Sequence, residues 1–129
     1  MSHWRKQQHL DRYFQQAKEE GYRSRSAYKL KQINDRFRLL HRGDRVVDLG
    51  AAPGGWSQVA AKAVGNEGSV IAVDLVQIDE LPGVALIQGD MTAADVQERI
   101  REAAAGPIDV VLSDAAPSTS GIWARDHGL

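Results

Sequence analysis

The chain has 129 residues, no cysteine and a formal net charge of -1, with 43% hydrophobic and 26% charged residues. This length suits one compact domain, and the composition excludes a disordered or fibrous protein, a disulfide framework and a cysteine-ligated metal. No apolar run approaches the roughly 18 residues of a membrane span, and the first residues contain no apolar signal core, so we expect a cytoplasmic protein.

Positive charge is concentrated in the amino-terminal third. Residues 1–42 carry eleven Lys or Arg against four Asp or Glu, a balance of +7, whereas residues 43–129 carry five against thirteen, a balance of -8. A basic segment joined to an acidic domain is typical of a phosphate-binding arm, because lysine and arginine displace counterions from nucleic acid. We therefore divide the chain into a basic helical extension, 1–42, and a domain, 43–129. The alternative is a solvated basic helix that binds nothing.

Two helices are predicted in the basic extension. Residues 3–20 contain no turn residue and read as helical, and Gly21 then interrupts the pattern. Ser24 or Ser26 can cap a second helix. Its apolar stripe, which we expect to dock on the domain, consists of Tyr28, Leu30, Ile33, Phe37 and Leu40.

The rest of the chain alternates between short apolar runs and amphipathic segments, which predicts an α/β fold. Strands are expected at 45–49, 69–73, 84–87 and 108–112, and helices at 56–64 and 93–105. Because right-handed crossovers make such a sheet parallel, we predict the strand order 3-2-1-4, with the functional loops at the carboxyl ends of the strands.

A glycine-rich loop, DLGAAPGGW at 48–56, joins the first predicted strand to its helix. Its glycines allow a ligand to approach the backbone, and the helix start offers unpaired amides. A phosphate loop requires Gly-Lys-Ser or Gly-Lys-Thr, but Trp56 follows Gly55, and a dinucleotide loop requires a different glycine spacing. The pattern D-x-G-x-x-P-G-G resembles the first motif of Rossmann-like methyltransferases, which implies S-adenosylmethionine. NAD is the alternative cofactor.

Acidic residues follow the other three predicted strands. Asp74 closes the second strand, where a carboxylate can accept both hydroxyl hydrogens of an adenosine ribose. Asp90 follows the third strand and can accept from the adenine amino group, and Asp114 follows the fourth strand, beside the first. Asp74 and Asp90 also fit ordinary turn residues, but together the three carboxylates would line one rim of a crevice.

Four segments resemble the FtsJ-like ribosomal RNA large-subunit methyltransferases: RSRSAYKL at 23–30, VVDLGAAPGGWSQ at 46–58, QGD at 88–90 and SDAAP at 113–117. The resemblance implies methyl transfer from S-adenosylmethionine to the 2′ hydroxyl of a uridine in large-subunit rRNA, free or in the ribosomal subunit. Relatives with the same motifs methylate tRNA or messenger caps, so the RNA class stays open. The implied cofactor contacts are Gly54, Trp56, Asp74, Asp90 and Asp114, with Trp56 equally suited to packing.

The resemblance also implies catalytic residues. A 2′ hydroxyl is a weak nucleophile that must be oriented and deprotonated, and the family does this with lysine, aspartate, lysine and glutamate. Lys29 and Asp114 match the first two, but no lysine follows Lys62. We therefore expect the amino-terminal part of such an enzyme, or alternatively a non-catalytic module that binds S-adenosylmethionine and RNA. The expected phosphate contacts are Arg23, Arg25, Lys31, Arg36 and Arg38.

Two further expectations concern the sheet edge and metals. With the sheet cut short after about four strands, Val110, Val111 and Leu112 are expected on an open edge, which favours self-association. The four histidines have no metal-site spacing, so no metal is predicted.

Overall fold

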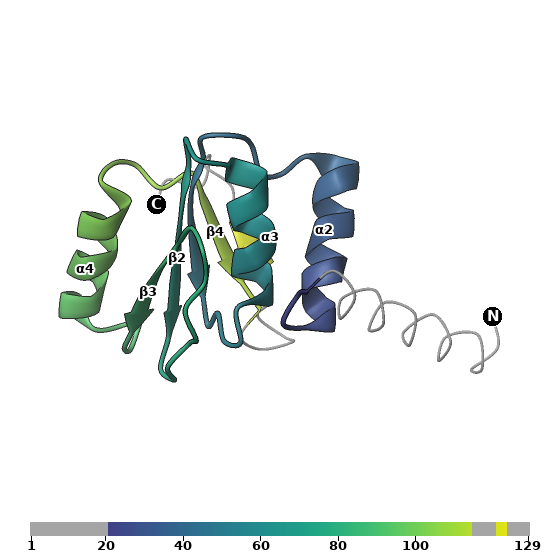
Figure 1. Ribbon diagram of the computed structural model, residues 1–129. Helices are drawn as coiled ribbons and strands as arrows, with labels where there is room; N and C mark the ends of the chain where they lie inside the picture. The colour runs from purple at the N-terminus through teal and green to yellow at the C-terminus, as the bar shows by residue number, and fades with distance from the viewer. Residues whose placement is uncertain (1–20, 115–120, 124–129) are drawn as a thin grey trace.

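A computed structural model of the chain describes residues 21–114 and the backbone of 121–123 (Figure 1). The predicted helix at 3–20 lies outside the described residues, as do residues 115–117 of the SDAAP segment. The elements are α2 (Arg25–Phe37), β1 (Arg45–Leu49), α3 (Gly55–Val64), β2 (Ser69–Asp74), β3 (Val84–Gln88), α4 (Ala94–Ala104), β4 (Val110–Ser113) and β5 (Gly121–Trp123). No helix in this described part is long and apolar enough to cross a membrane.

The strands form one sheet of order β3-β2-β1-β4-β5, in which the first four strands are parallel. The predicted order 3-2-1-4 is confirmed. The expectation of an open edge at β4 is wrong, because β5 pairs with it antiparallel, with Val111 opposite Trp123 and Leu112 opposite Ile122. A strand of three residues is too short to be recognised from periodicity, and its presence removes the stated reason for self-association.

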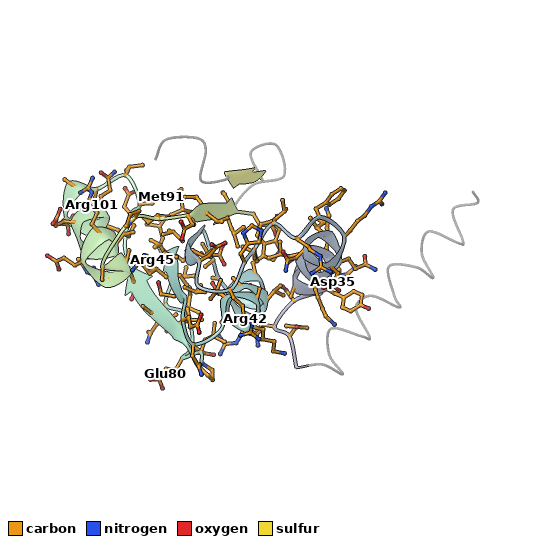
Figure 2. All side chains as sticks on the ribbon, turned by 90° about the horizontal axis from the view of Figure 1, so that it is seen from above. Asp35, Arg42, Arg45, Glu80, Met91 and Arg101 are labelled. Carbon is orange, nitrogen blue, oxygen red and sulfur yellow. The ribbon has the colours of Figure 1, made fainter. Side chains whose placement is uncertain are left out.

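Helices cover both faces of the sheet, with α2 and α3 on one face and α4 on the other (Figures 1 and 2). Because side chains alternate along a strand, neighbouring valines of β1 enter different cores. Val46 packs with residues of α2 and α3, whereas Val47 packs with residues of α4. Because β1, β2, β3 and β4 are parallel, their carboxyl ends lie at the same end of the sheet.

The docking face of α2 differs from the predicted stripe. Ala27 and Leu30 are fully buried in the core shared with α3, but Phe37 is 62% exposed. Arg38, directly after the helix, adopts a left-handed conformation with φ 50°, and the chain then brings Leu40 into the core. This change of direction explains why Leu40 is buried, whereas Phe37, at the last position of the helix, is exposed.

Three contacts fix the first turn of α2 against the first turn of α3. A Cβ atom on Gly55 would lie only 3.0 Å from the Cβ of Ala27 and would collide with the Ser24 hydroxyl. The indole Nε1 of Trp56 donates a hydrogen bond to the Ser26 carbonyl oxygen at 2.9 Å. The basic helix is thereby fixed beside the glycine-rich loop, and Lys29 lies one turn further along it.

Candidate functional site

The glycine-rich loop runs from the end of β1 across the end of β2. Gly50, with φ 68°, donates its amide to the Val73 carbonyl oxygen at 2.8 Å, and Ala51 donates to the same oxygen at 3.1 Å. The chain then passes through a cis Ala52–Pro53 bond to Gly54, which precedes α3 with φ 112°. The two hydrogen bonds to the Val73 carbonyl oxygen hold the start of the loop against the end of β2.

Two of the cavities along this loop have several lining residues in common. The larger, about 330 Å³, is lined by Gly50, Ala52, Val73, Asp74, Leu75, Gly89, Asp90, Met91 and Asp114. The smaller, about 40 Å³, is lined by Ser24, Ser26, Asp48, Gly50, Ala51, Ala52, Pro53, Gly55, Trp56 and Asp114. Because Gly50, Ala52 and Asp114 line both, the cavities are two parts of one elongated site. The wide part is close to β2 and β3, and the narrow part is close to α2.

Asp74 fixes the loop and retains unused acceptor capacity. Its Oδ2 accepts the Ala52 amide at 2.9 Å, and its Oδ1 accepts the Val76 amide at 3.0 Å. A carboxylate has about four lone-pair positions, so each oxygen can accept one further hydrogen bond. The half-buried Asp74 side chain can therefore receive two hydroxyl groups from a ligand in the larger cavity.

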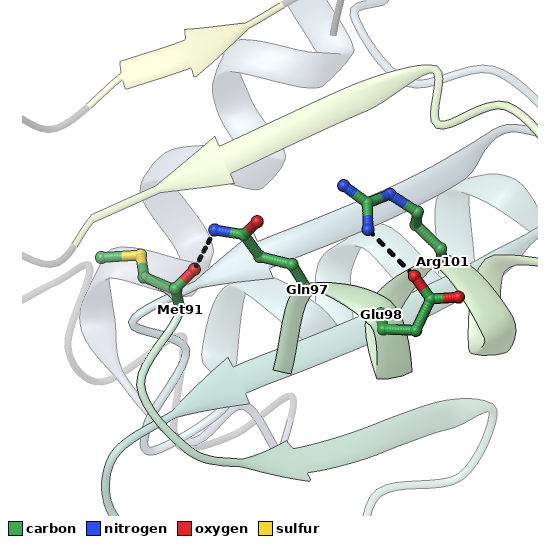
Figure 3. A network of polar contacts seen from close by, with 4 residues as sticks. All are labelled: Met91, Gln97, Glu98 and Arg101. Carbon is green, nitrogen blue, oxygen red and sulfur yellow. Dashed lines mark hydrogen bonds and ion pairs between the residues drawn. The ribbon is translucent and has the colours of Figure 1, made fainter. Parts of the chain in front are cut away.

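Asp90 is exposed in the turn after β3. Its Oδ1 accepts the Thr92 amide at 2.8 Å and the Thr92 hydroxyl at 2.7 Å, and these hydrogen bonds lower the pKa of Asp90. Gln97 of α4 donates to the Met91 carbonyl oxygen at 3.2 Å and so ties the same turn to the helix (Figure 3). The turn thus presents an ionised carboxylate and the Met91 side chain to the larger cavity.

Asp48 is a buried carboxyl group in the smaller cavity, with 1% of its surface exposed. The Ser57 hydroxyl donates to its Oδ2 at 2.7 Å. Burial is the main cause that raises the pKa of Asp48 to about 7; the Ser57 hydrogen bond opposes it, and the nearby charges of Asp114 and Asp74 add to it. Sequence reasoning gave this residue no role of its own, although an acidic residue inside an apolar strand was a signal for one.

The structure brings four of the five predicted cofactor residues to the site. Trp56, Asp74, Asp90 and Asp114 line it, and Trp56 also packs, since its indole is bonded to α2. Gly54 lines neither cavity, because it faces Leu81 and Arg23. Ser24 and Ser26, which the sequence predicts only as helix caps, also line the smaller cavity. Ser24 does occupy the N-cap position of α2, but its hydroxyl lies 2.9 Å from that of Ser26.

The predicted phosphate contacts lie in three different environments. Arg25, Arg36 and Arg38 are exposed on or next to α2, as is Lys29, whereas Lys31 is half-buried with its ammonium 5.7 Å from the centre of the Tyr28 ring. The Arg23 guanidinium instead donates to three backbone carbonyl oxygens within the protein. Within the described residues, no group of three or more His, Asp or Glu could hold a metal ion.

This combination defines a class of protein. A parallel sheet with a glycine-rich loop after β1, and carboxylates after β2, β3 and β4, forms a Rossmann-like site for a nucleoside-containing cofactor. The loop has neither the lysine of a phosphate loop nor the glycine spacing of a dinucleotide loop, which leaves the methyltransferase type.

Comparisons with known proteins agree with this class. A model of the FtsJ-like methyltransferase family matches residues 22–129. Ribosomal RNA large subunit methyltransferase E of Methanothrix thermoacetophila is 60% identical over 117 residues, covering 91% of this chain and 45% of the relative. The protein of the same name from Methanothermobacter thermautotrophicus is 52% identical over 126 residues, covering 96% and 60%. A crystal structure from Plasmodium falciparum, described as a ribosomal RNA methyltransferase, matches with a TM-score of 0.66 and 33% identity, covering 74% of this chain and 57% of that chain.

The chain therefore belongs to the FtsJ-like methyltransferase family. The methyl donor of this family is S-adenosylmethionine. The chain spans about half the length of the curated relatives it matches.

The Asp48 carboxyl group predicts a pH dependence of stability. Its folded-state pKa of about 7 lies above the ordinary value of 3.8, so the folded state holds the proton more tightly than the unfolded state. The free energy of unfolding should therefore fall as pH rises from about 4 to about 7, by on the order of 3 kcal/mol. Asp48→Asn, which keeps an acceptor for Ser57, should lack this component. Urea unfolding of both proteins from about pH 5 to about pH 8 measures it, and parallel profiles would contradict the assignment.

Proposed function

We propose that this chain holds S-adenosylmethionine along the elongated site, with the nucleoside in the larger cavity and the methionine part in the smaller one. The observation that carries this proposal is the continuity of the two cavities along Gly50, Ala52 and Asp114. We further propose that the whole protein transfers the methyl group to the ribose 2′ hydroxyl of a uridine in large-subunit rRNA.

The chemistry of the lining supports this orientation. The free acceptor positions of Asp74 suit the two ribose hydroxyls, and the ionised Asp90 suits the adenine amino group. Leu75 and Met91 provide apolar contact for a flat base in the same cavity. The narrow cavity offers the hydroxyls of Ser24 and Ser26 together with the backbone at the start of α3, which are suitable partners for an amino acid group.

Lys29 and Asp114 are the proposed catalytic residues. Asp114 lines both cavities and so lies where the nucleoside and methionine parts of the cofactor would join. Lys29 belongs to the helix whose preceding turn is anchored to α3 through Trp56 and Ser26. When bound, the cofactor supplies an electrophilic methyl group. Lys29 and Asp114 would orient the ribose hydroxyl toward it and favour its deprotonation.

The exposed side of α2 is the proposed RNA surface. Arg25, Lys29 and Arg36 are separated by four and seven residues and therefore share one face of the helix. Ala27 and Leu30 are buried on a different face, so the basic face is directed away from α3. The Arg36 guanidinium also lies 5.3 Å from the centre of the exposed Phe37 ring, which combines a phosphate contact with an aromatic surface.

Removal of the Asp74 charge tests the cofactor site. In the whole protein, Asp74→Asn should weaken S-adenosylmethionine binding roughly tenfold or more, because a hydrogen bond to a charged group is worth about 1.5–3 kcal/mol. Asp95→Asn, on the exposed surface of α4, is the matched control and should bind normally. Titration calorimetry with S-adenosylmethionine and with NADH measures both affinities. Binding of NADH without S-adenosylmethionine would refute the proposed cofactor.

Truncation of Lys29 tests the reaction. Lys29→Ala in the whole protein should lower methyl transfer to large-subunit rRNA by about 100-fold or more, because hydroxyl activation is lost, with cofactor affinity unchanged. Lys62→Ala removes a lysine that lies 4.6 Å from the Tyr22 ring and should remain active. Transfer is followed with labelled methyl groups, and a 2′-O-methylated product resists alkaline cleavage. Methylation of a base would contradict the proposed acceptor, and binding of both ligands without transfer would indicate the non-catalytic module.

Arg36→Ala tests the RNA surface. Loss of one phosphate contact should weaken binding of an rRNA fragment and lower the slope of log Kd against log salt concentration by about 1. Arg101→Ala is the control, since Arg101 on α4 pairs with Glu98 on an exposed surface (Figure 3). Fluorescence anisotropy over a range of salt concentrations gives both slopes. An unchanged slope in the Arg36 variant would remove this arginine from the proposed surface.

A further inference from the structure

Arg23, two residues before α2, joins segments that are far apart in the chain. Its Nη1 donates to the Pro53 carbonyl oxygen at 3.0 Å and to the Asp79 carbonyl oxygen at 2.8 Å. Its Nη2 donates to the Glu80 carbonyl oxygen at 2.8 Å. The Arg23 amide donates to the Gln58 side chain in α3, also at 2.8 Å. One residue thus connects the start of α2, the glycine-rich loop, α3 and the segment 75–83.

We infer that Arg23 is a positioning residue for the cofactor site, a role that rests on the proposed function. Two amides hold the Asp74 carboxylate, those of Ala52 and Val76, and they belong to the glycine-rich loop and to the segment 75–83. Arg23 connects the same two stretches of chain at a second point, through Pro53 on one side and Asp79 and Glu80 on the other. The guanidinium therefore holds in place the two backbone amides that orient the Asp74 carboxylate.

The packing around the guanidinium agrees with this role. A Cβ atom on Gly54 would lie 3.4 Å from the Arg23 Nη1 and 2.7 Å from the Leu81 Cδ1, so glycine at this position leaves room for both side chains. Ile78 and Leu81 are buried in a small core with Ala51 and Ala72. The segment 75–83 is thus packed beneath the glycine-rich loop and is clamped to it by Arg23.

The geometry also distinguishes this role from the expected phosphate contact. Two nitrogen atoms of one planar guanidinium engage consecutive carbonyl oxygens, an arrangement that a lysine ammonium cannot reproduce. Pro53, Asp79 and Glu80 are exposed, so water can replace the arginine at their carbonyl oxygens. Loss of Arg23 should therefore loosen the two segments locally and leave global stability nearly unchanged.

Hydrogen exchange and calorimetry on the whole protein test the clamp. In the cofactor-free protein, Arg23→Ala should raise amide exchange at Ala52 and Val76 about tenfold or more, with little change in core strands. It should weaken S-adenosylhomocysteine binding roughly tenfold. Arg23→Lys should recover only part of the amide protection and part of the S-adenosylhomocysteine affinity. This variant is the test if the alanine variant does not fold. Arg101→Ala should match the original protein in both measurements.

The outcomes separate the clamp from the proposed function. Unchanged exchange at Ala52 and Val76 in both Arg23 variants would overturn the inference, and a lower salt dependence of RNA binding would then identify Arg23 as a phosphate contact. A uniform rise in exchange at all amides would also overturn it, since the role would be global stability. If the original protein binds no S-adenosylhomocysteine but Arg23→Ala still raises local exchange, the proposed function fails and the clamp stands.

Discussion

The hydrogen bond between the Ala52 amide and the Asp74 carboxylate is the contact on which the site depends. It joins the loop after β1 to the end of β2 and so couples the positions of the two segments. A carboxylate already oriented by two amides needs little reorganisation when it accepts ligand hydroxyls, which lowers the entropic cost of binding. Ala52, which makes this contact, also lines both cavities.

The site also depends on how the glycine-rich loop is positioned relative to the basic helix α2. Close packing at Gly55 and the Trp56 hydrogen bond set the position of the first turn of α2, whose serines complete the narrow cavity. A helix that supplies both cavity lining and basic side chains is therefore part of the site. The same face of the sheet that buries Ala27 and Leu30 also determines where the cations of α2 point.

Much of this arrangement could be predicted from the sequence. Four β-branched runs separated by amphipathic segments gave the parallel strands and their order, and strand-end carboxylates indicated the rim. Features that depend on tertiary placement could not be predicted. The three residues of β5 have no detectable period. Phe37 has the spacing of a core residue but lies beyond the packed part of α2. The carbonyl partners of Arg23 come from segments that meet it only in the folded chain. The sequence places Asp48 inside an apolar strand, but the extent of its burial and its hydrogen bond with Ser57 depend on the folded chain.

The opposite charges of α2 and of the cavity rim have a consequence for how a polyanion would approach. The net positive charge of α2 would attract a nucleic acid toward this helix. The carboxylates of Asp74, Asp90 and Asp114 would repel any phosphate that entered the larger cavity. Under the proposed function, attraction at the helix and repulsion at the rim would together keep a sugar-phosphate backbone outside the larger cavity.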